Sequence, residues 1–266
     1  MKAVIGQEKL VKILDSYTLQ TVPRTMLFLG PDGCGKGWIS ARFAEQLGLD
    51  WVEIKPDVTS EKLIEYFQCP IQRMYFINLK EFDERQQNKI LKFIEEPSSN
   101  MCVILRAESE IGVLPTILNR CVKHAFEDYT PEQLKEFAWA IKCDDDRIYQ
   151  ICKTPGQLDK LPDDNLNQVF DLCSAIVSML PAASYANTLS LATKIDFKGN
   201  AGKIDFDLFF DVLVYVAFDR YKSNKDDLSF EIYRYTAAQR AKAYNKAIAK
   251  ESFMLNYLDN LWRLAH

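Results

Sequence analysis

The segment GPDGCGKG, from Gly30 to Gly37, restricts how this chain can fold more than any other part of the sequence. It follows a short apolar run, MLFLG (Met26–Gly30), and it precedes a helical pattern over residues 38–47. A buried strand that enters a glycine-rich turn and leaves it as a helix is the setting in which the pattern GxxxxGK binds phosphate. Glycines let backbone N–H groups converge on an anion, and the lysine adds a positive charge. The sequence therefore predicts a phosphate loop formed by Gly30, Gly33, Gly35, Lys36 and Gly37.

The residue after the lysine determines how much chemistry this loop can support. A working phosphate loop has serine or threonine there, because the hydroxyl group helps to hold Mg²⁺. This chain has Gly37, which has no side chain. We therefore predict no metal site, and the sequence leaves open whether ATP or ADP still binds.

A later strand should carry the acidic residues of such a site. In phosphate-loop ATPases this strand ends in a carboxylate that supports the metal, and an adjacent acid activates the attacking water. Here the strand is MYFIN (Met74–Asn78), so Asn78 and Leu79 occupy these two positions. A carboxamide is a poor Mg²⁺ ligand and leucine accepts no proton, so we predict a degenerate second motif. The alternative is a weak ATPase in which Glu81 or Asp83 substitutes for the missing acid.

Strands alternate with helices in the first half of the chain, which predicts a parallel sheet with helices on both faces. The expected strands are 26–30, 51–55, 74–78 and 101–107, and the expected helices are 7–18, 38–47, 60–67 with Ser60 as N-cap, and 84–96. Helical patterns then follow at 131–141, 144–152, 166–179, 185–193, 205–221, 230–250 and 252–264, with a turn at Thr154–Gly156. We predict an α/β module over 1–127, a small helical module over 128–162 and an all-α bundle over 163–266.

Composition excludes several classes of protein. The formal net charge of -4 argues against a chain held to nucleic acid by its overall charge. Seven cysteines without a CxxC pair argue against a disulfide framework and a zinc site, and they favour the cytoplasm. No apolar run approaches the length of a membrane span, so we expect no membrane partner.

Four stretches resemble the AAA+ clamp-loader family, and most closely the delta-prime subunits of bacterial DNA polymerase III. They are IGQEKLVKILDS, MLFLGPDGCGKG, QQNKILKFIEEPSSNMCVIL and VLPTILNRC. The resemblance implies an AAA+ module, a helical lid and a C-terminal collar that holds subunits in a ring. The family's usual four-cysteine zinc module is missing, since only Cys69 lies between the two ATP motifs. The chain is therefore expected to be a phage or divergent bacterial homologue.

In this family an arginine of a Ser-Arg-Cys motif reaches into the ATP site of the adjacent subunit. The corresponding residues are Asn119, Arg120 and Cys121, so the resemblance makes Arg120 a trans arginine finger. The alternative is an ordinary surface arginine. The family's cis sensor arginine corresponds to Gln157, so that charge is absent.

The resemblance implies a delta-prime-like subunit of the DNA polymerase III holoenzyme, which helps to load the sliding clamp onto primed DNA. It would lack ATPase activity of its own and require no cofactor. Its partners would be gamma/tau-like ATPase subunits and a delta-like subunit, and indirectly the sliding clamp and primer–template DNA. The alternatives are the weak autonomous ATPase and an AAA+-derived interaction protein outside the clamp loader.

Overall fold

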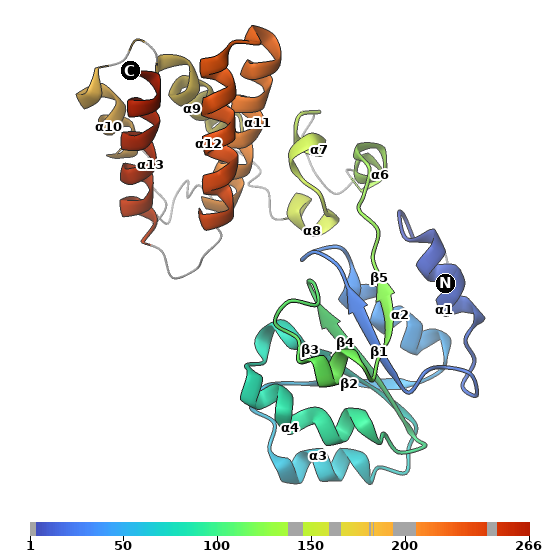
Figure 1. Ribbon diagram of the computed structural model, residues 1–266. Helices are drawn as coiled ribbons and strands as arrows, with labels where there is room; N and C mark the ends of the chain where they lie inside the picture. The colour runs from blue at the N-terminus through green and yellow to red at the C-terminus, as the bar shows by residue number, and fades with distance from the viewer. Residues whose placement is uncertain are drawn as a thin grey trace. The chain divides into compact units, whose positions relative to one another are not determined.

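The computed structural model describes residues 4–137, 146–159, 166–180, 182, 184–193, 206–243 and 249–266. The chain forms two compact units (Figure 1). One consists of Met1–Ala140 with Cys152–Asp159, and the other of Ile141–Ile151 with Lys160–His266. The separate helical module over 128–162 stays a prediction, because residues 138–145 and 160–165 lie outside the described residues.

The first unit is built on a five-stranded sheet in which every pairing is parallel. Its strands are β1 (Thr25–Leu29), β2 (Asp50–Ile54), β3 (Arg73–Asn78), β4 (Met101–Ala107) and β5 (Val122–Ala125), in the spatial order β2-β3-β4-β1-β5. The predicted parallel sheet is confirmed. The sequence analysis missed β5, because this edge strand is short and only His124 among its residues is buried.

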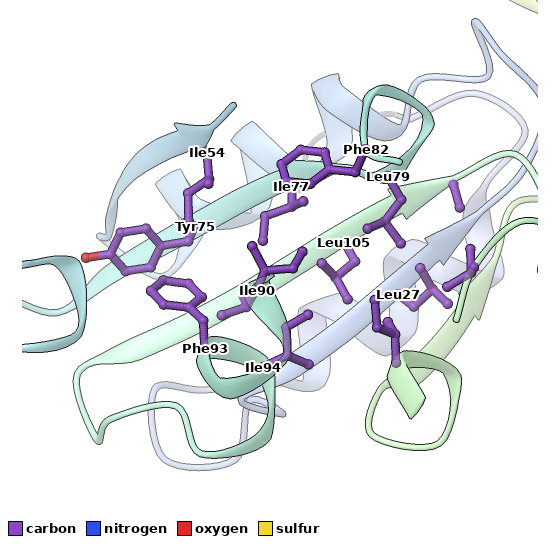
Figure 2. Close-up of a cluster of buried hydrophobic side chains, with 14 of the residues drawn as sticks. Leu27, Ile54, Tyr75, Ile77, Leu79, Phe82, Ile90, Phe93, Ile94 and Leu105 are labelled. Carbon is purple, nitrogen blue, oxygen red and sulfur yellow. The ribbon is translucent and has the colours of Figure 1, made fainter. Parts of the chain in front are cut away.

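Both faces of the sheet are covered, as predicted. Side chains that alternate along a strand enter two separate cores, since successive residues point to opposite faces. Tyr75 and Ile77 of β3 belong to one core, and Met74 and Phe76 belong to the other. Figure 2 shows the first core, in which Tyr75 and Ile77 face side chains of α4 (Glu84–Glu95) such as Phe93.

Two groups of helices supply the covering layers (Figure 1). The core in Figure 2 also receives residues of α3 (Ser60–Phe67) and α5 (Pro115–Leu118). The opposite core receives residues of α1 (Glu8–Ser16) and α2 (Lys36–Gln46). Burial of apolar side chains on both faces therefore fixes the sheet between the two helix layers.

Helix caps correct one prediction. Ser60 is not the N-cap of α3, because the Thr59 side chain accepts the hydrogen bond from the Lys62 N–H at 3.2 Å. Both residues are good capping types, and only the backbone geometry distinguishes them. Asp83 begins α4 with a full capping box that includes Gln86. Asp83 therefore has a structural role at the start of this helix.

The segment predicted as a turn at Thr154–Gly156 is the start of a short helix, α8 (Pro155–Leu158), which packs on the phosphate loop. The Thr154 hydroxyl donates to the Asp32 carbonyl at 3.0 Å, and the Gly156 N–H donates to the Gly33 carbonyl at 3.0 Å. The two glycines touch, since a Cβ added to Gly156 would lie 2.5 Å from the Cα of Gly33. Another helix of this region is α6 (Pro131–Glu136), which begins with a capping box at Thr130.

The second unit is helical, as predicted for the C-terminal part. Its helices are α7 (Ile148–Ile151), α9 (Leu166–Met179), α10 (Tyr185–Thr193), α11 (Phe206–Asn224), α12 (Asp227–Ala243) and α13 (Lys250–Ala265). The helix expected over 230–250 was wrong at both ends, because α12 begins at Asp227 and Lys250 belongs to α13. Aromatic side chains fill its core, where Phe210 lies against Phe206, Phe253 and Tyr257. None of the helices within the described residues is long and apolar enough to cross a membrane.

A first prediction concerns His124, whose burial lowers its pKa from the ordinary value of 6.5. The ring packs edge-on against Phe28, with centroids 5.8 Å apart. Below pH 6.5 the unfolded chain binds a proton more readily than the folded chain, so stability falls as the pH decreases from that value towards the lower folded pKa. The loss is at most about 1.4 kcal/mol per pH unit for one proton. We expect His124→Phe to unfold with a weaker pH dependence than wild type between pH 7.5 and 5.5 in urea titrations.

His266 provides the matched control, because it is the only other histidine and it is exposed. His266→Gln should keep the wild-type pH dependence. An unchanged pH dependence in His124→Phe would show that this ring does not titrate with folding.

A second prediction concerns the contact between Gly156 and Gly33. Alanine at position 156 would force the new methyl group against the loop backbone, and overpacking of this kind costs about 1–3 kcal/mol. We expect Gly156→Ala to lower the free energy of unfolding by this amount in denaturant titrations. Lys153→Ala is the control, because Lys153 is exposed in the same segment. Equal stability of the two variants would contradict a close packing of α8 on the loop.

Candidate phosphate loop and arginine finger

The predicted phosphate loop joins β1 to α2, so it lies at the carboxyl end of a central strand. Gly33 and Gly35 have φ angles of 78° and 94°. Residues with a side chain rarely adopt this left-handed region, whereas glycine enters it without strain. The loop therefore has the position and the backbone conformation that its glycines predicted.

Hydrogen-bond donors of the protein bond to the carbonyl oxygens of the loop. Lys36 Nζ donates to the carbonyl oxygens of Gly30 and Pro31 at 2.5 and 2.7 Å. The Tyr129 hydroxyl donates to the Cys34 carbonyl at 3.0 Å, in addition to the two bonds from α8 described above. These contacts hold the loop in one conformation without consuming its N–H groups.

The N–H groups of the loop are the remaining hydrogen-bonding groups. Within the described part of the chain, no acceptor bonds to the backbone N–H of Gly33, Gly35 or Gly37, whereas the Lys36 N–H bonds to the Cys34 sulfur. An array of N–H groups at the start of a helix attracts anions, because the helix dipole adds positive potential there.

Gly37 faces a cation rather than an open metal position. A Cβ at Gly37 would lie 2.8 Å from Nη1 of Arg106, a residue of β4. The same guanidinium donates through Nη2 to Glu53 Oε1 at 2.6 Å. The sequence analysis missed Arg106, although an arginine inside the apolar run MCVILRA was a visible irregularity.

Asn78 and Leu79 both have local structural roles. The Asn78 side-chain amide donates to Glu81 Oε1 at 2.7 Å. Leu79 is buried in the core shown in Figure 2, beside α4. A buried leucine at this position leaves no group that could activate water.

The two carboxylates of the alternative hypothesis are also engaged. Glu81 accepts from Asn78 and lies 3.7 Å from Lys55 Nζ, which itself pairs with Glu53 at 3.0 Å. Asp83 accepts the Gln86 N–H at 2.7 Å as the cap of α4. Among the described residues, no group of three or more His, Cys, Asp or Glu side chains could hold a metal ion.

Gln157 folds back onto its own turn. Its side-chain oxygen accepts the Lys153 N–H at 2.6 Å, so the amide stabilises the start of α8. A neutral side chain in this arrangement supplies no charge to a phosphate.

Arg120 lies just beyond α5 and is partly exposed, with 41% of its side chain accessible. Nη1 donates to the Thr116 carbonyl at 2.8 Å, and Nη2 lies 3.1 Å from Glu95 Oε1. Two contacts hold the planar group in a defined orientation and leave part of it open to solvent. Glu95 was also missed, although it belongs to the FIEEP segment that carried the resemblance.

Part of the chain is similar to a known protein family. A family described as "DNA polymerase III, delta subunit" matches residues 67–130, which include β3, α4, β4 and the Arg120 segment. No curated protein matches the sequence significantly.

Solved structures share the fold at low sequence identity. A DNA polymerase III gamma subunit-related protein from Thermotoga maritima superposes with a TM-score of 0.55 at 12% identity, over 97% of this chain and 99% of the other. A RuvB variant from the same organism gives a TM-score of 0.50 at 15% identity, over 98% of this chain and 87% of the other. Residues 67–130 are thus similar to a DNA polymerase III subunit family, and the solved structures show that this chain shares their fold.

Proposed function

We propose that this chain is a delta-prime-like subunit of a clamp loader, which places Arg120 at the ATP site of a neighbouring subunit and hydrolyses no ATP itself. Its partners are gamma/tau-like ATPase subunits and a delta-like subunit in the cytoplasm. Through them it acts on the sliding clamp and primer–template DNA.

The arrangement of Arg120 is the observation that carries this proposal. A finger must present a guanidinium to another molecule, so it has to be accessible and yet held in place. Glu95 and the Thr116 carbonyl hold one side of Arg120, and 41% of the side chain is accessible. The contact with Glu95 is worth little for stability, because exposed ion pairs contribute about 0–1 kcal/mol. Orientation of the guanidinium is the better account of this pair.

The residues at the chain's own ATP site support the second part of the proposal, that this chain hydrolyses no ATP. A carboxamide and a buried leucine stand where ATPases carry acids, and no hydroxyl follows Lys36. The weak-ATPase alternative uses Glu81 or Asp83. Glu81 is bonded to Asn78 and lies near Lys55, and Asp83 caps α4. In this proposal, ATP is therefore hydrolysed at the neighbouring subunit's site.

A third prediction tests the finger. We expect Arg120→Ala, reconstituted with its ATPase partners, to reduce DNA-stimulated hydrolysis at the adjacent site by about 10³-fold, the typical contribution of an arginine finger. The measurement is phosphate release from a complex in which the adjacent ATP site is the only one left active.

Lys123→Ala is the matched control, because Lys123 is a nearby cation that is 40% exposed and pairs with Glu110. Assembly of both variants with the partners is checked by gel filtration. Equal hydrolysis in wild-type and Arg120→Ala complexes would refute the finger. Failure of the wild-type chain to join any clamp-loader subunit would instead favour an interaction protein with another role.

A fourth prediction concerns the isolated chain. We expect no steady ATP turnover above the background of a Lys36→Ala preparation, since the described site offers no group to activate water. The check is phosphate release at high protein concentration, with Glu81→Gln and Asp83→Asn measured in parallel. Turnover that Lys36→Ala and one of these two variants abolish would establish the weak-ATPase alternative.

A further inference from the structure

The guanidinium of Arg106 lies beside Gly37, the position at which a working phosphate loop carries serine or threonine. Nη1 lies 2.8 Å from the position of a Cβ at Gly37. A serine or threonine hydroxyl at residue 37 would project into the same space. Arg106 is largely buried, with 15% of its side chain exposed, so the guanidinium is part of the site.

Arg106 has one firm partner and spare hydrogen-bonding capacity. Nη2 donates to Glu53, and the group lies over the Phe76 ring at 5.8 Å from its centroid. No described residue accepts a hydrogen bond from Nη1, and Nε is buried without a partner. A buried N–H that lacks an acceptor is costly, and a ligand oxygen would remove that cost.

Two kinds of donor therefore meet at the loop. The N–H groups of Gly33, Gly35 and Gly37 have no acceptor within the described residues, and Nη1 of Arg106 lies beside Gly37. Lys36 adds a second full positive charge. Donors and charges of this kind suit the oxygens of a phosphate group.

A divalent cation does not fit the same place. Its charge would face the Arg106 guanidinium, and like charges at close range repel strongly when partly buried. Position 37 offers no hydroxyl, and Asn78 directs its amide group to Glu81. Glu53, the carboxylate bonded to Arg106, is also paired with Lys55.

We propose that the phosphate loop binds a phosphate group without a divalent cation, and that Arg106 supplies in place of the metal the positive charge beside Gly37. The ligand class is a nucleoside triphosphate or an inorganic polyphosphate, because both present the same phosphate oxygens. The proposal does not depend on Arg120 or on the clamp-loader role, so a failed finger experiment leaves it standing.

The test is calorimetric titration of the full chain with ATP and, separately, with tripolyphosphate. Each titration is run in EDTA and in excess Mg²⁺. We expect the dissociation constant in EDTA to be equal to or lower than that in Mg²⁺, since metal binding to the ligand competes with Arg106. The tighter of the two probes identifies the ligand as a nucleotide or a free polyphosphate.

Variants locate the effect at Arg106. We expect Arg106→Gln to weaken binding in EDTA by about tenfold or more, the usual consequence of losing a charged hydrogen bond. Arg106→Lys, which keeps the charge, should lose less affinity. Arg42→Gln is the control, because Arg42 is exposed on α2 and pairs with Glu45. Circular dichroism verifies that each variant is folded.

Three results would overturn the proposal. They are binding that requires Mg²⁺, absence of binding by either probe, and affinity of Arg106→Gln equal to that of Arg42→Gln.

Discussion

Parallel pairing of β4 with β1 on one side and β3 on the other is the constraint on which the candidate site depends. The register places Arg106 opposite Phe28 of β1 and opposite Asn78 of β3. All strands run in one direction, so their carboxyl ends meet at one edge of the sheet. The phosphate loop, the degenerate second motif and Arg106 are close together for this reason alone.

Charged side chains at this edge pair with one another. Arg106 and Lys55 share Glu53, and Lys55 also reaches Glu81. Burial alone would raise the pKa of Glu53, but hydrogen bonds from Lys55 and Arg106 outweigh it and lower the pKa below its usual value. Two unit charges 4 Å apart interact by about 4 kcal/mol at an effective dielectric constant near 20. A divalent ion beside Arg106 would face a repulsion of at least that order.

The phosphate loop also has a structural role in the first unit. Lys36 bonds to the loop carbonyls of Gly30 and Pro31, and Gly156 approaches Gly33 so closely that neither glycine can carry a side chain without displacement. Gly33, a glycine of the phosphate-loop pattern, therefore has a packing role. Glu95 of α4 pairs with Arg120. The helix that covers the core therefore also orients the proposed finger.

The sequence alone determined the fold class and the loss of hydrolytic groups. Apolar runs followed by helical patterns specified a parallel sheet between two helix layers, because such strands must be buried on both faces. The sequence alone shows that position 37 has no hydroxyl group and that positions 78 and 79 have no carboxylate. The residues there are Gly37, Asn78 and Leu79, and a side-chain group is a property of the residue type. The identity of these three residues does not show which other side chains lie at the same place in the fold.

Tertiary structure decided the contacts that connect distant parts of the chain. Arg106 meets Gly37 only through strand register, and Gly156 meets Gly33 only through the packing of α8. β5 was missed because its residues are mostly exposed and its stability comes from pairing with β1. Local patterns report helix and strand periodicity, whereas pairing between residues far apart in sequence depends on long-range burial and hydrogen bonding. The sequence therefore determined which residue types occupy the phosphate loop and the end of β3, and only the fold decided which distant side chains lie beside them.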